Sequence, residues 1–564
     1  MQPADSFTRE VIKNALVAIG DEMFTALKRT SMSPIIYETL DYAIGITDAA
    51  GRLIAQGNGV PLFIGTLDAA VRSVQEKFAG PGRISPGDVF ITNDPYGGGG
   101  THLSDVTLVR PIFHEGTLLA WAANKAHWTE VGGKDAGSFS PNTTEIYQEG
   151  LQFPAVRLFD QGRINEALVD MIRANVRLPD MTLGDMWAGA AALQLGERRF
   201  LDLVAKYGTA GVADAVEHLL DHGEAMIRQE LARLPKGTFT AEDMVDDDGL
   251  GNGPFPVRVA ITITDSEFIA DFTGSAAQAP GPINNTRAGL LSAVRAVFKA
   301  LTNPAIPATE GVFRPLKVIC PDGTVMTASR PAPVSIYYET MISAADVMWK
   351  ALAPHMPDRL PAGHYGSVCA TVIAGRHPDS GDFFLLVEPL AGGWGAACDG
   401  DGQQGQFCVG NGETYNIPVE VTEARYGVRV ERFGFHTEDG GAGRFRGGKG
   451  LQLEYRVLGD GAFMSTTFGR YRHRPWAMQG GQEGSPNFAE VVRGDGEVVR
   501  FSKTARLPLA KGDLVRLVTG TGGGWGDPRE RDPARVAADL RDGYLTPAQA
   551  ARDYGHASGQ TGGQ

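Results

Sequence analysis

The chain has 564 residues, which is enough for three or four domains at ~100–200 residues each. Its net charge of −14 argues against binding to nucleic-acid phosphates, and its 43% apolar and 21% charged residues are typical of a soluble globular protein. There is no run of about 18 apolar residues and no signal-peptide pattern at the N-terminus, so we expect a cytoplasmic protein without a membrane span.

The positions of the glycines and cysteines further restrict the class of protein. The 73 glycines cluster in short runs, which we interpret as turns and close backbone approaches rather than as a sequence repeat. The four cysteines include no Cys-x-x-Cys pair, so we expect reduced thiols rather than disulfides or a thiolate metal site. These cysteines are Cys320, Cys369, Cys398 and Cys408.

The first hundred residues show helical and strand patterns in turn. Apolar residues at steps of three and four predict a helix over residues 6–30. A β-hairpin is predicted over residues 42–56, followed by a helix over 67–78 and a strand over 88–92.

A second hairpin is predicted over residues 103–126, with its turn at Glu115-Gly116. Such a turn pairs residue i with about residue 231 − i across the ladder. Asp105 is then expected to face Ala126, and His102 to face Thr129.

The open end of this second hairpin carries two histidines and a carboxylate. His102 and Asp105 open its first strand, and His127 closes its second strand. Cross-strand neighbours are close enough for these side chains to share one ion. Mixed imidazole and carboxylate ligands favour zinc or manganese over calcium or magnesium, whereas the alternative is a hairpin end with ordinary polar residues.

The rest of the chain contains three regions that differ in predicted secondary structure. Residues 165–232 are predicted to be helical, short β segments and two helices follow from about residue 255, and strands with glycine turns dominate residues 365–527. Helices are expected at 533–542 and 547–554, with a disordered end after them. We therefore expect an α+β multidomain protein, with a mixed α/β N-terminal half that holds the hairpin and a β-rich, glycine-rich C-terminal half. The expected segments are 1–160 (metal-binding), 161–250 (helical), 251–364 (α+β), 365–528 (β-rich) and 529–564 (helical and disordered).

No nucleotide-binding loop is convincing. Gly443 to Lys449 follows most of the phosphate-loop pattern, but Gly450 replaces the hydroxyl residue that binds magnesium, and β segments flank it. Gly522–Gly526 does not fit the dinucleotide glycine spacing, and no Gly-x-Ser-x-Gly elbow of a serine hydrolase occurs.

Several long motifs in a fixed order resemble the hydantoinase B family. The motifs are Tyr37-Glu-Thr-Leu-Asp41-Tyr-Ala, Asn93-Asp-Pro-Tyr-Gly-Gly-Gly-Gly-Thr-His102-Leu-Ser-Asp105, Lys125-Ala-His127-Trp128, Gln148-Glu-Gly-Leu-Gln-Phe-Pro154, Asp271-Phe-Thr-Gly-Ser275 and Thr521-Gly-Gly-Gly-Trp-Gly-Asp-Pro528. The resemblance runs from about residue 6 to 528. The family includes N-methylhydantoinase, 5-oxoprolinase and caprolactamase subunits, and distantly acetone and acetophenone carboxylase subunits.

The resemblance implies a metal site and a partner. Its four ligands map onto Asp41, His102, Asp105 and His127, and Asp41 is carried by the resemblance alone. The expected protein is the B subunit of an ATP-dependent cyclic amidase, with Zn²⁺ (or Mn²⁺) bound here and ATP and Mg²⁺ bound by an A-type subunit, in an A2B2 heterotetramer. The residues that could act as general base or contact the substrate are Glu38, Asp94, Lys125 and Glu149.

Two other functions fit the same four ligands. The first is a subunit of an ATP-dependent ketone carboxylase, and the second is a scaffold subunit with a structural metal. A structural site is closed by four protein ligands, whereas a catalytic site keeps a position for water. The sequence does not identify which cyclic amide or ketone is the substrate.

Overall fold

The computed structural model describes residues 5–412 and 414–556, which form two compact units. The first unit comprises Met1–Phe239, Val259–Ala345 and Gly410–Tyr415, and the second comprises Thr240–Arg258, Asp346–Val409 and Asn416–Gln564. The expected disordered end lies, from residue 557 onward, outside the described residues.

The first unit is built on a seven-stranded antiparallel sheet with the order β2-β1-β5-β4-β3-β6-β7. Its strands are β1 (Tyr42–Asp48), β2 (Leu53–Gly59), β3 (Val89–Thr92), β4 (Asp105–His114), β5 (Thr117–His127), β6 (Val156–Asp160) and β7 (Arg163–Ile164). The central strands β1, β5 and β4 therefore come from the two hairpins that the sequence predicted, and both hairpins are confirmed.

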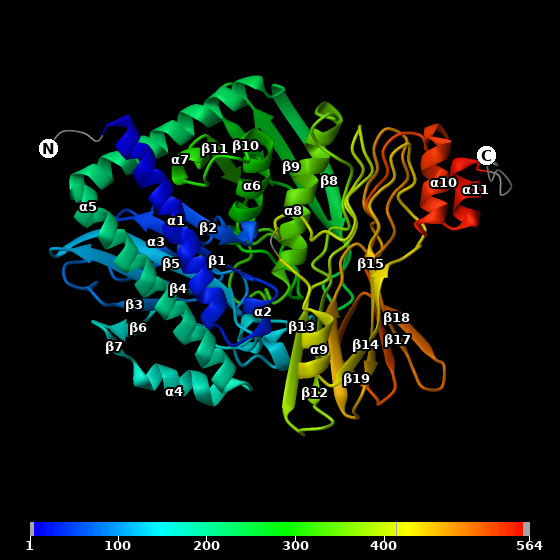
Figure 1. The fold of residues 1–564 in the computed structure, drawn as a ribbon, viewed down its shortest axis with the longest axis horizontal. Helices are drawn as coiled ribbons and strands as arrows, with labels where there is room; N and C mark the ends of the chain where they lie inside the picture. The colour runs from blue at the N-terminus through cyan, green and yellow to red at the C-terminus, as the bar shows by residue number, and fades with distance from the viewer. Residues whose placement is uncertain (1–4, 413, 557–564) are drawn as a thin grey trace. The chain divides into compact units, whose positions relative to one another are not determined.

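Helices cover both faces of this sheet. Tyr42 of β1 stacks on Phe24 of helix α1 (Ser6–Thr30), with ring centroids 4.2 Å apart. Gly45 lies on the opposite side of β1, where the site of a Cβ atom is 2.9 Å from Leu67 of helix α3 (Leu67–Lys77). Helix α5 (Pro179–Arg233) runs beside α1 and contacts β4 and β5 (Figure 1). Because both faces are covered, β1 is buried along nearly its whole length.

The register of the β4–β5 hairpin differs by one residue from the prediction. The turn lies at Glu115-Gly116 as predicted, and both residues have positive φ, 48° and 79°. Next to the turn Phe113 pairs with Leu118, but Ile112 pairs with Ala120, so Leu119 is an extra residue in β5. Such a β-bulge shifts the pairing of every residue farther from the turn, and apolar alternation in the sequence does not reveal it.

Two predicted pairings are therefore wrong. Asp105 pairs with His127 rather than with Ala126. His102 precedes β4 in a turn, where its carbonyl accepts the backbone N–H of Asp105, so it is not paired across the ladder with Thr129.

The remaining elements of the N-terminal half are helices and a four-stranded sheet with the order β11-β10-β9-β8. The strands are β8 (Gly237–Val245), β9 (Phe255–Ile263), β10 (Phe268–Asp271) and β11 (Leu316–Ile319), of which β10 and β11 are parallel. The helices are α2 (Pro34–Tyr37), α4 (Glu166–Asn175), α6 (Arg287–Thr302), α7 (Glu310–Phe313) and α8 (Tyr337–Leu352), with short 3₁₀ turns η1 (Pro61–Phe63), η2 (Ala136–Ser138), η3 (Ile146–Gln148) and η4 (Ala353–His355). The division between the two units falls within β8, β9 and α8.

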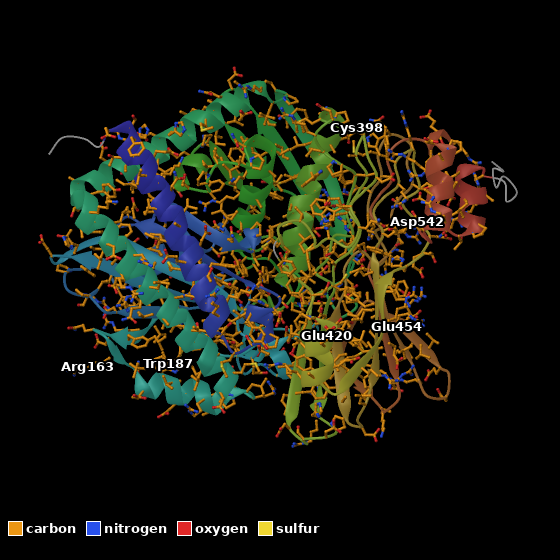
Figure 2. The ribbon with its side chains drawn as sticks, in the orientation of Figure 1. Arg163, Trp187, Cys398, Glu420, Glu454 and Asp542 are labelled. Carbon is orange, nitrogen blue, oxygen red and sulfur yellow. The ribbon has the colours of Figure 1, made fainter. Side chains whose placement is uncertain are left out.

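The second unit contains two further sheets, with the orders β13-β12-β16-β19 and β14-β15-β20-β17-β18. Their strands are β12 (Ala370–Arg376), β13 (Phe383–Glu388), β14 (Val428–Phe435), β15 (Leu451–Val457), β16 (Ala462–Thr467), β17 (Phe488–Val492), β18 (Val498–Phe501), β19 (Lys503–Leu509) and β20 (Leu514–Val518). The helices are α9 (Val419–Arg425), η5 (Pro528–Glu530), α10 (Pro533–Arg541) and α11 (Pro547–Tyr554). Exposed charged residues of this unit include Glu420 on α9 and Asp542 after α10 (Figure 2).

Glycines allow backbone segments of the second unit to touch. A Cβ atom on Gly448 would lie 1.8 Å from the carbonyl oxygen of Gln403, and one on Gly393 would lie 2.0 Å from the carbonyl oxygen of Gly448. The N–H of Gly448 donates to Trp394, and the N–H of Gly522 donates to Gly448. At these positions glycine is required for space rather than for conformation, since neither Gly448 nor Gly393 has a positive φ.

No helix within residues 5–412 and 414–556 combines the length and the apolar character needed to cross a membrane. None of the four cysteines is in a disulfide within the described residues.

Candidate metal centre

Three neighbouring strands bring Asp41, His127 and Asp105 into one row at the same end of the large sheet. Tyr42 pairs with Ala126, and the N–H of His127 donates to the carbonyl oxygen of Asp41 at 3.0 Å, so Asp41 lies beside His127 on one side. Asp105 pairs with His127 on the other side. The order β1-β5-β4 thus accounts for the position of Asp41, which the hairpin alone did not predict.

His102 completes a compact group with Asp105 and His127. One potential ligand atom from each of the three residues can be chosen so that all lie within 4.8 Å of one another. His102 Nε2 is 3.2 Å from Asp105 Oδ1, and the two imidazole rings have centroids 5.0 Å apart. The three side chains are buried, with relative exposures of 4%, 1% and 7%. Asp41 lies next to this group but is not one of its three members.

The hydrogen bonds around the group orient two of its members. His102 Nδ1 lies 3.0 Å from the carbonyl oxygen of Ser335, which can only accept, so Nδ1 carries a proton and Nε2 is the nitrogen that faces Asp105. Asp105 Oδ2 accepts the hydroxyls of Thr101 at 2.5 Å and of Tyr337 at 2.9 Å. Asp105 Oδ1 remains directed at His102.

The electrostatics follow from burial and from the close packing of opposite charges. Burial raises the pKa of Asp41 to about 7, and the negative charge of Asp105 raises it as well. Despite its burial, Asp105 has a lowered pKa because His102 lies beside it. Burial, and then the neighbouring His102, lower the pKa of His127 to about 4, so this imidazole is neutral at physiological pH.

These residues fit a zinc or manganese ion. His127 Nδ1 is buried and has no hydrogen-bond partner among the described residues, although a buried polar atom without a partner is costly. The two atoms His102 Nε2 and Asp105 Oδ1 are 3.2 Å apart, and neighbouring ligands of a tetrahedral ion with ~2.0 Å bonds lie roughly 3.3 Å apart. A donor set of two nitrogens with carboxylate oxygens is one that both metals accept.

Two of the predicted catalytic residues, Lys125 and Glu149, are buried in the same unit. Lys125 precedes His127 by two residues on β5, so both side chains are on the same face of the sheet. Its ammonium donates to the carbonyl oxygen of Gly99 at 2.8 Å and lies 5.3 Å from the ring centroid of Phe63, and burial lowers its pKa to about 8. Burial raises the pKa of Glu149 to about 7, and its carboxylate accepts hydrogen bonds from three donor groups, the N–H groups of Val334 and Ser335 and the hydroxyl of Thr143.

The other two, Asp94 and Glu38, are partly exposed. Asp94 Oδ1 is 3.2 Å from the guanidinium of Arg330, and the same oxygen accepts the backbone N–H of Tyr96. Glu38 is the C-cap of helix α2, and its backbone N–H donates to the carbonyl oxygen of Pro34. None of these contacts reaches His102, Asp105 or His127, so the catalytic roles of all four residues stay predictions.

Sequence reasoning missed Ser335 and Tyr337, which contact two members of the group. They lie more than 200 residues from His102 in the sequence, and neither belongs to a motif with a known ligand spacing. Pro-rich residues 331–334 before helix α8 gave the only local signal, that of a fixed turn.

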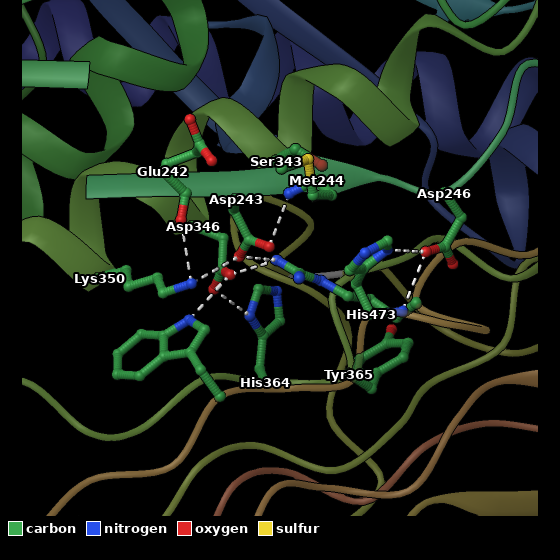
Figure 3. Close-up of polar contacts among 12 residues, drawn as sticks. Glu242, Asp243, Met244, Asp246, Ser343, Asp346, Lys350, His364, Tyr365 and His473 are labelled. Atoms are coloured by element: carbon green, nitrogen blue, oxygen red, sulfur yellow. Dashed lines mark hydrogen bonds and ion pairs between the residues drawn. The ribbon is translucent and has the colours of Figure 1, made fainter. Parts of the chain in front are cut away.

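A second buried polar cluster lies in the second unit, and no sequence motif predicted it. Asp243, Asp346 and His364 converge there (Figure 3). The guanidinium of Arg470 is 3.0 Å from Asp243 and 2.5 Å from Asp346. His364 Nδ1 lies 3.2 Å from Asp346, and His364 Nε2 accepts the N–H of Val409 at 3.0 Å. Because both ring nitrogens are engaged, His364 has no lone pair for a metal, and we interpret the cluster as structural.

Comparison with known proteins identifies similar chains. A family model described as hydantoinase B/oxoprolinase matches residues 5–528. An uncharacterized protein of Methanocaldococcus jannaschii is 34% identical over 98% of this chain and 96% of its own. The caprolactamase subunit beta of Pseudomonas jessenii is 31% identical, again over 98% and 96%.

Solved structures agree with the fold. The crystal structure of the ATP-dependent caprolactamase from Pseudomonas jessenii superposes with a TM-score of 0.93 at 29% identity, covering 100% of this chain and 98% of that one. A nucleotide-free acetone carboxylase structure superposes with a TM-score of 0.90, covering 98% and 79%. At 19% identity, the likeness to acetone carboxylase shows a shared fold only.

Proposed function

The chain belongs to the hydantoinase B/oxoprolinase family, and from this premise we propose that it is the metal-binding catalytic B subunit of an ATP-dependent cyclic amidase. The proposed reaction is hydrolysis of a hydantoin ring, an oxoproline-like lactam ring or another lactam ring. An A-type subunit is the proposed partner, in an A2B2 heterotetramer. The relative named as a caprolactamase subunit beta supports both the substrate class and the need for a partner.

The observation that carries this proposal is the buried group of His102, Asp105 and His127, with Asp41 beside it. We propose these four residues as ligands of Zn²⁺ or, as the second choice, Mn²⁺. Such an ion supplies a Lewis acid that polarises an amide carbonyl and lowers the pKa of water. The position of His102 Nε2, which faces Asp105 while Nδ1 is bound to the backbone, and the unpaired Nδ1 of His127 support this assignment.

The residues of this chain prepare the centre for the reaction. Ser335 holds the tautomer of His102, and Thr101 and Tyr337 hold the carboxylate of Asp105, so these ligands need little reorganisation. Lys125 lies next to His127 on the same face and keeps N–H donors beyond the one that it gives to Gly99. We propose Lys125 as a substrate contact, because a buried ammonium can donate to an oxygen that gains negative charge.

We propose that ATP acts on the partner subunit. An unstrained ring amide is stabilised by resonance, so its hydrolysis benefits from activation. The partner transfers the γ-phosphoryl group from ATP to the amide oxygen and releases ADP. A first water attacks the activated carbon, and the carbon–nitrogen bond breaks to leave the ring-opened amine and an acyl phosphate. A second water hydrolyses the acyl phosphate to the carboxylate and phosphate. The near-miss loop at Gly443–Gly450 supports this division, because it leads into strand β15 rather than into a helix N-terminus that could bind phosphate.

Reconstitution tests this function. The purified chain alone is expected to turn over no ATP with a panel of hydantoins, lactams and ketones, and addition of an A-type partner is expected to start turnover with a cyclic amide. With ATP and labelled bicarbonate present, a hydrolase yields a ring-opened amino or carbamoyl acid that carries no label. Product analysis by mass spectrometry measures both results.

Two outcomes of this experiment would overturn the proposal. ATP turnover by the isolated chain with substrate would contradict the assignment of ATP to a partner. Stable label in a β-keto acid formed from a ketone would instead identify a ketone carboxylase. The fold match to acetone carboxylase alone does not favour that function.

A further inference from the structure

Both oriented members of the candidate metal centre are held by one short segment, Val334–Tyr337. The carbonyl oxygen of Ser335 accepts from His102 Nδ1 at 3.0 Å, and the hydroxyl of Tyr337 donates to Asp105 Oδ2 at 2.9 Å. This segment precedes and begins helix α8, and its residues are buried. A displacement of the segment would therefore disturb His102 and Asp105 together.

The segment is fixed by the carboxylate of Glu149. Oε1 of Glu149 accepts the N–H of Val334 at 3.0 Å and the N–H of Ser335 at 2.9 Å, and Oε2 accepts the N–H of Val334 at 3.1 Å. The hydroxyl of Thr143 donates to Oε1 at 2.7 Å. Because both oxygens of this buried carboxyl group accept from the same short segment, these bonds hold the backbone of the segment in place.

A second connection aligns Glu149 with the segment. Glu149 follows the turn η3, and the N–H of Ile146 in that turn donates to the carbonyl oxygen of Pro331 at 3.0 Å. Glu149 itself is only 2% exposed. A buried carboxylate is costly unless it is well hydrogen-bonded, and here the bonds that satisfy it run to the backbone that supports the metal ligands.

We propose that Glu149 is a positioning residue, which sets the tautomer of His102 and the orientation of Asp105 through the segment Val334–Tyr337. Its role is not that of a general base, because its oxygens accept from Val334, Ser335 and Thr143. The expected effect of Glu149 on metal affinity rests on the proposed metal centre. Its effect on the His102 tautomer is independent of any metal.

The test compares three variants of the full chain. Glu149→Gln replaces one acceptor oxygen with an amide N–H₂ that faces the N–H groups of the segment. We expect it to lower zinc affinity about 10–100-fold, the usual effect of removing a partner that orients metal ligands. Chelator competition measures the affinity, and the visible spectrum of the cobalt(II)-loaded protein reports a changed ligand geometry.

Tyr337→Phe removes the other contact of the segment. It is expected to lower zinc affinity by about tenfold through Asp105 while the tautomer of His102 stays unchanged. ¹⁵N NMR of histidine-labelled, metal-free protein at alkaline pH, where the His102 ring is neutral, shows the tautomer directly. Glu149→Gln is expected to lower the fraction of His102 that carries the proton on Nδ1, relative to the native chain.

Glu130→Gln is the matched control. Glu130 is also fully buried, and it accepts the N–H groups of Gly132 and Gly137 at 2.7 and 2.9 Å, but the described residues that it contacts include neither His102 nor Asp105. This variant is expected to leave both zinc affinity and the His102 tautomer unchanged.

The outcomes separate this inference from the proposed function. If the native chain binds zinc and Glu149→Gln binds it equally well, the positioning role is wrong although the metal centre stands. If the native chain binds neither zinc nor manganese, the metal proposal fails, and the NMR comparison still decides on Glu149. An unchanged His102 tautomer in metal-free Glu149→Gln overturns the positioning role in either case.

Discussion

Replacing His102 with alanine is expected to lower the activity of the enzyme reconstituted with its A-type partner about 10³-fold or more. The change removes one of four proposed ligands and leaves Asp105 without the imidazole that lies 3.2 Å away. A metal ion contributes several kcal/mol to stabilising charge in a transition state, and each 1.36 kcal/mol corresponds to a factor of ten. Steady-state rates, together with the zinc content from elemental analysis, measure the effect.

His114→Ala is the control for this change. His114 lies at the opposite end of the same strand, β4, beside the turn, and it is only partly buried. Its replacement is expected to leave zinc content and activity unchanged. Equal activity and equal zinc content in His102→Ala and in the native enzyme would contradict the proposed ligand set.

Replacing Asp346 with alanine is expected to destabilise the second unit by about 3–5 kcal/mol, the usual cost of removing one partner of a buried ion pair. Asp346 and Asp243 hold the guanidinium of Arg470, whose side chain is 4% exposed. The indole N–H of Trp476 also donates to Asp346, at 3.0 Å. Although burial alone would raise it, the pKa of Asp346 is lowered because Arg470 and His364 lie beside it. Urea denaturation measures the change in the free energy of unfolding.

Asp542→Ala is the matched control in the same unit. Asp542 pairs with Arg541 at 2.9 Å, but the two side chains are 44% and 73% exposed. Exposed ion pairs contribute about 0–1 kcal/mol, so this variant is expected to unfold at nearly the native urea concentration. Similar midpoints for Asp346→Ala and Asp542→Ala would show that the buried cluster does not stabilise the unit.

The local structure of the chain could be predicted because local patterns determine it. The pattern of the apolar residues predicted α1 and both N-terminal hairpins, and the structure confirms them. The register of the second hairpin could not be predicted beyond its turn. A single extra residue, Leu119, shifts the pairing of the strands. The residues on either side of this β-bulge form no sequence pattern that reveals it.

Residues of the candidate site could be predicted where they lie close together in the sequence. His102, Asp105 and His127 lie within 26 residues on one hairpin, so strand pairing brings them together. Asp41 depends on the order of strands β1, β5 and β4 in the sheet, which a single sequence does not determine, and only the family resemblance indicated it. The positions of Ser335 and Tyr337 depend on tertiary packing across more than 200 residues.

The buried cluster of the second unit could not be predicted from the sequence either. Asp243, Asp346, His364 and Arg470 come from four separate parts of the chain, and none stands out in composition or spacing. A lone buried ion pair has no sequence signature, because its cost and its benefit depend on which groups surround it. Such clusters become visible only when the fold is known.

The most direct measurement of the central claim is anomalous X-ray scattering from crystals of the native chain at the zinc and manganese absorption edges. We predict one peak at bonding distance from Asp41, His102, Asp105 and His127, with a solvent molecule as a further ligand of the ion. A peak with four protein ligands and no solvent would indicate a structural rather than a catalytic metal. The absence of a peak among these residues at both edges, in protein purified without chelators and supplied with both metals, would contradict the account.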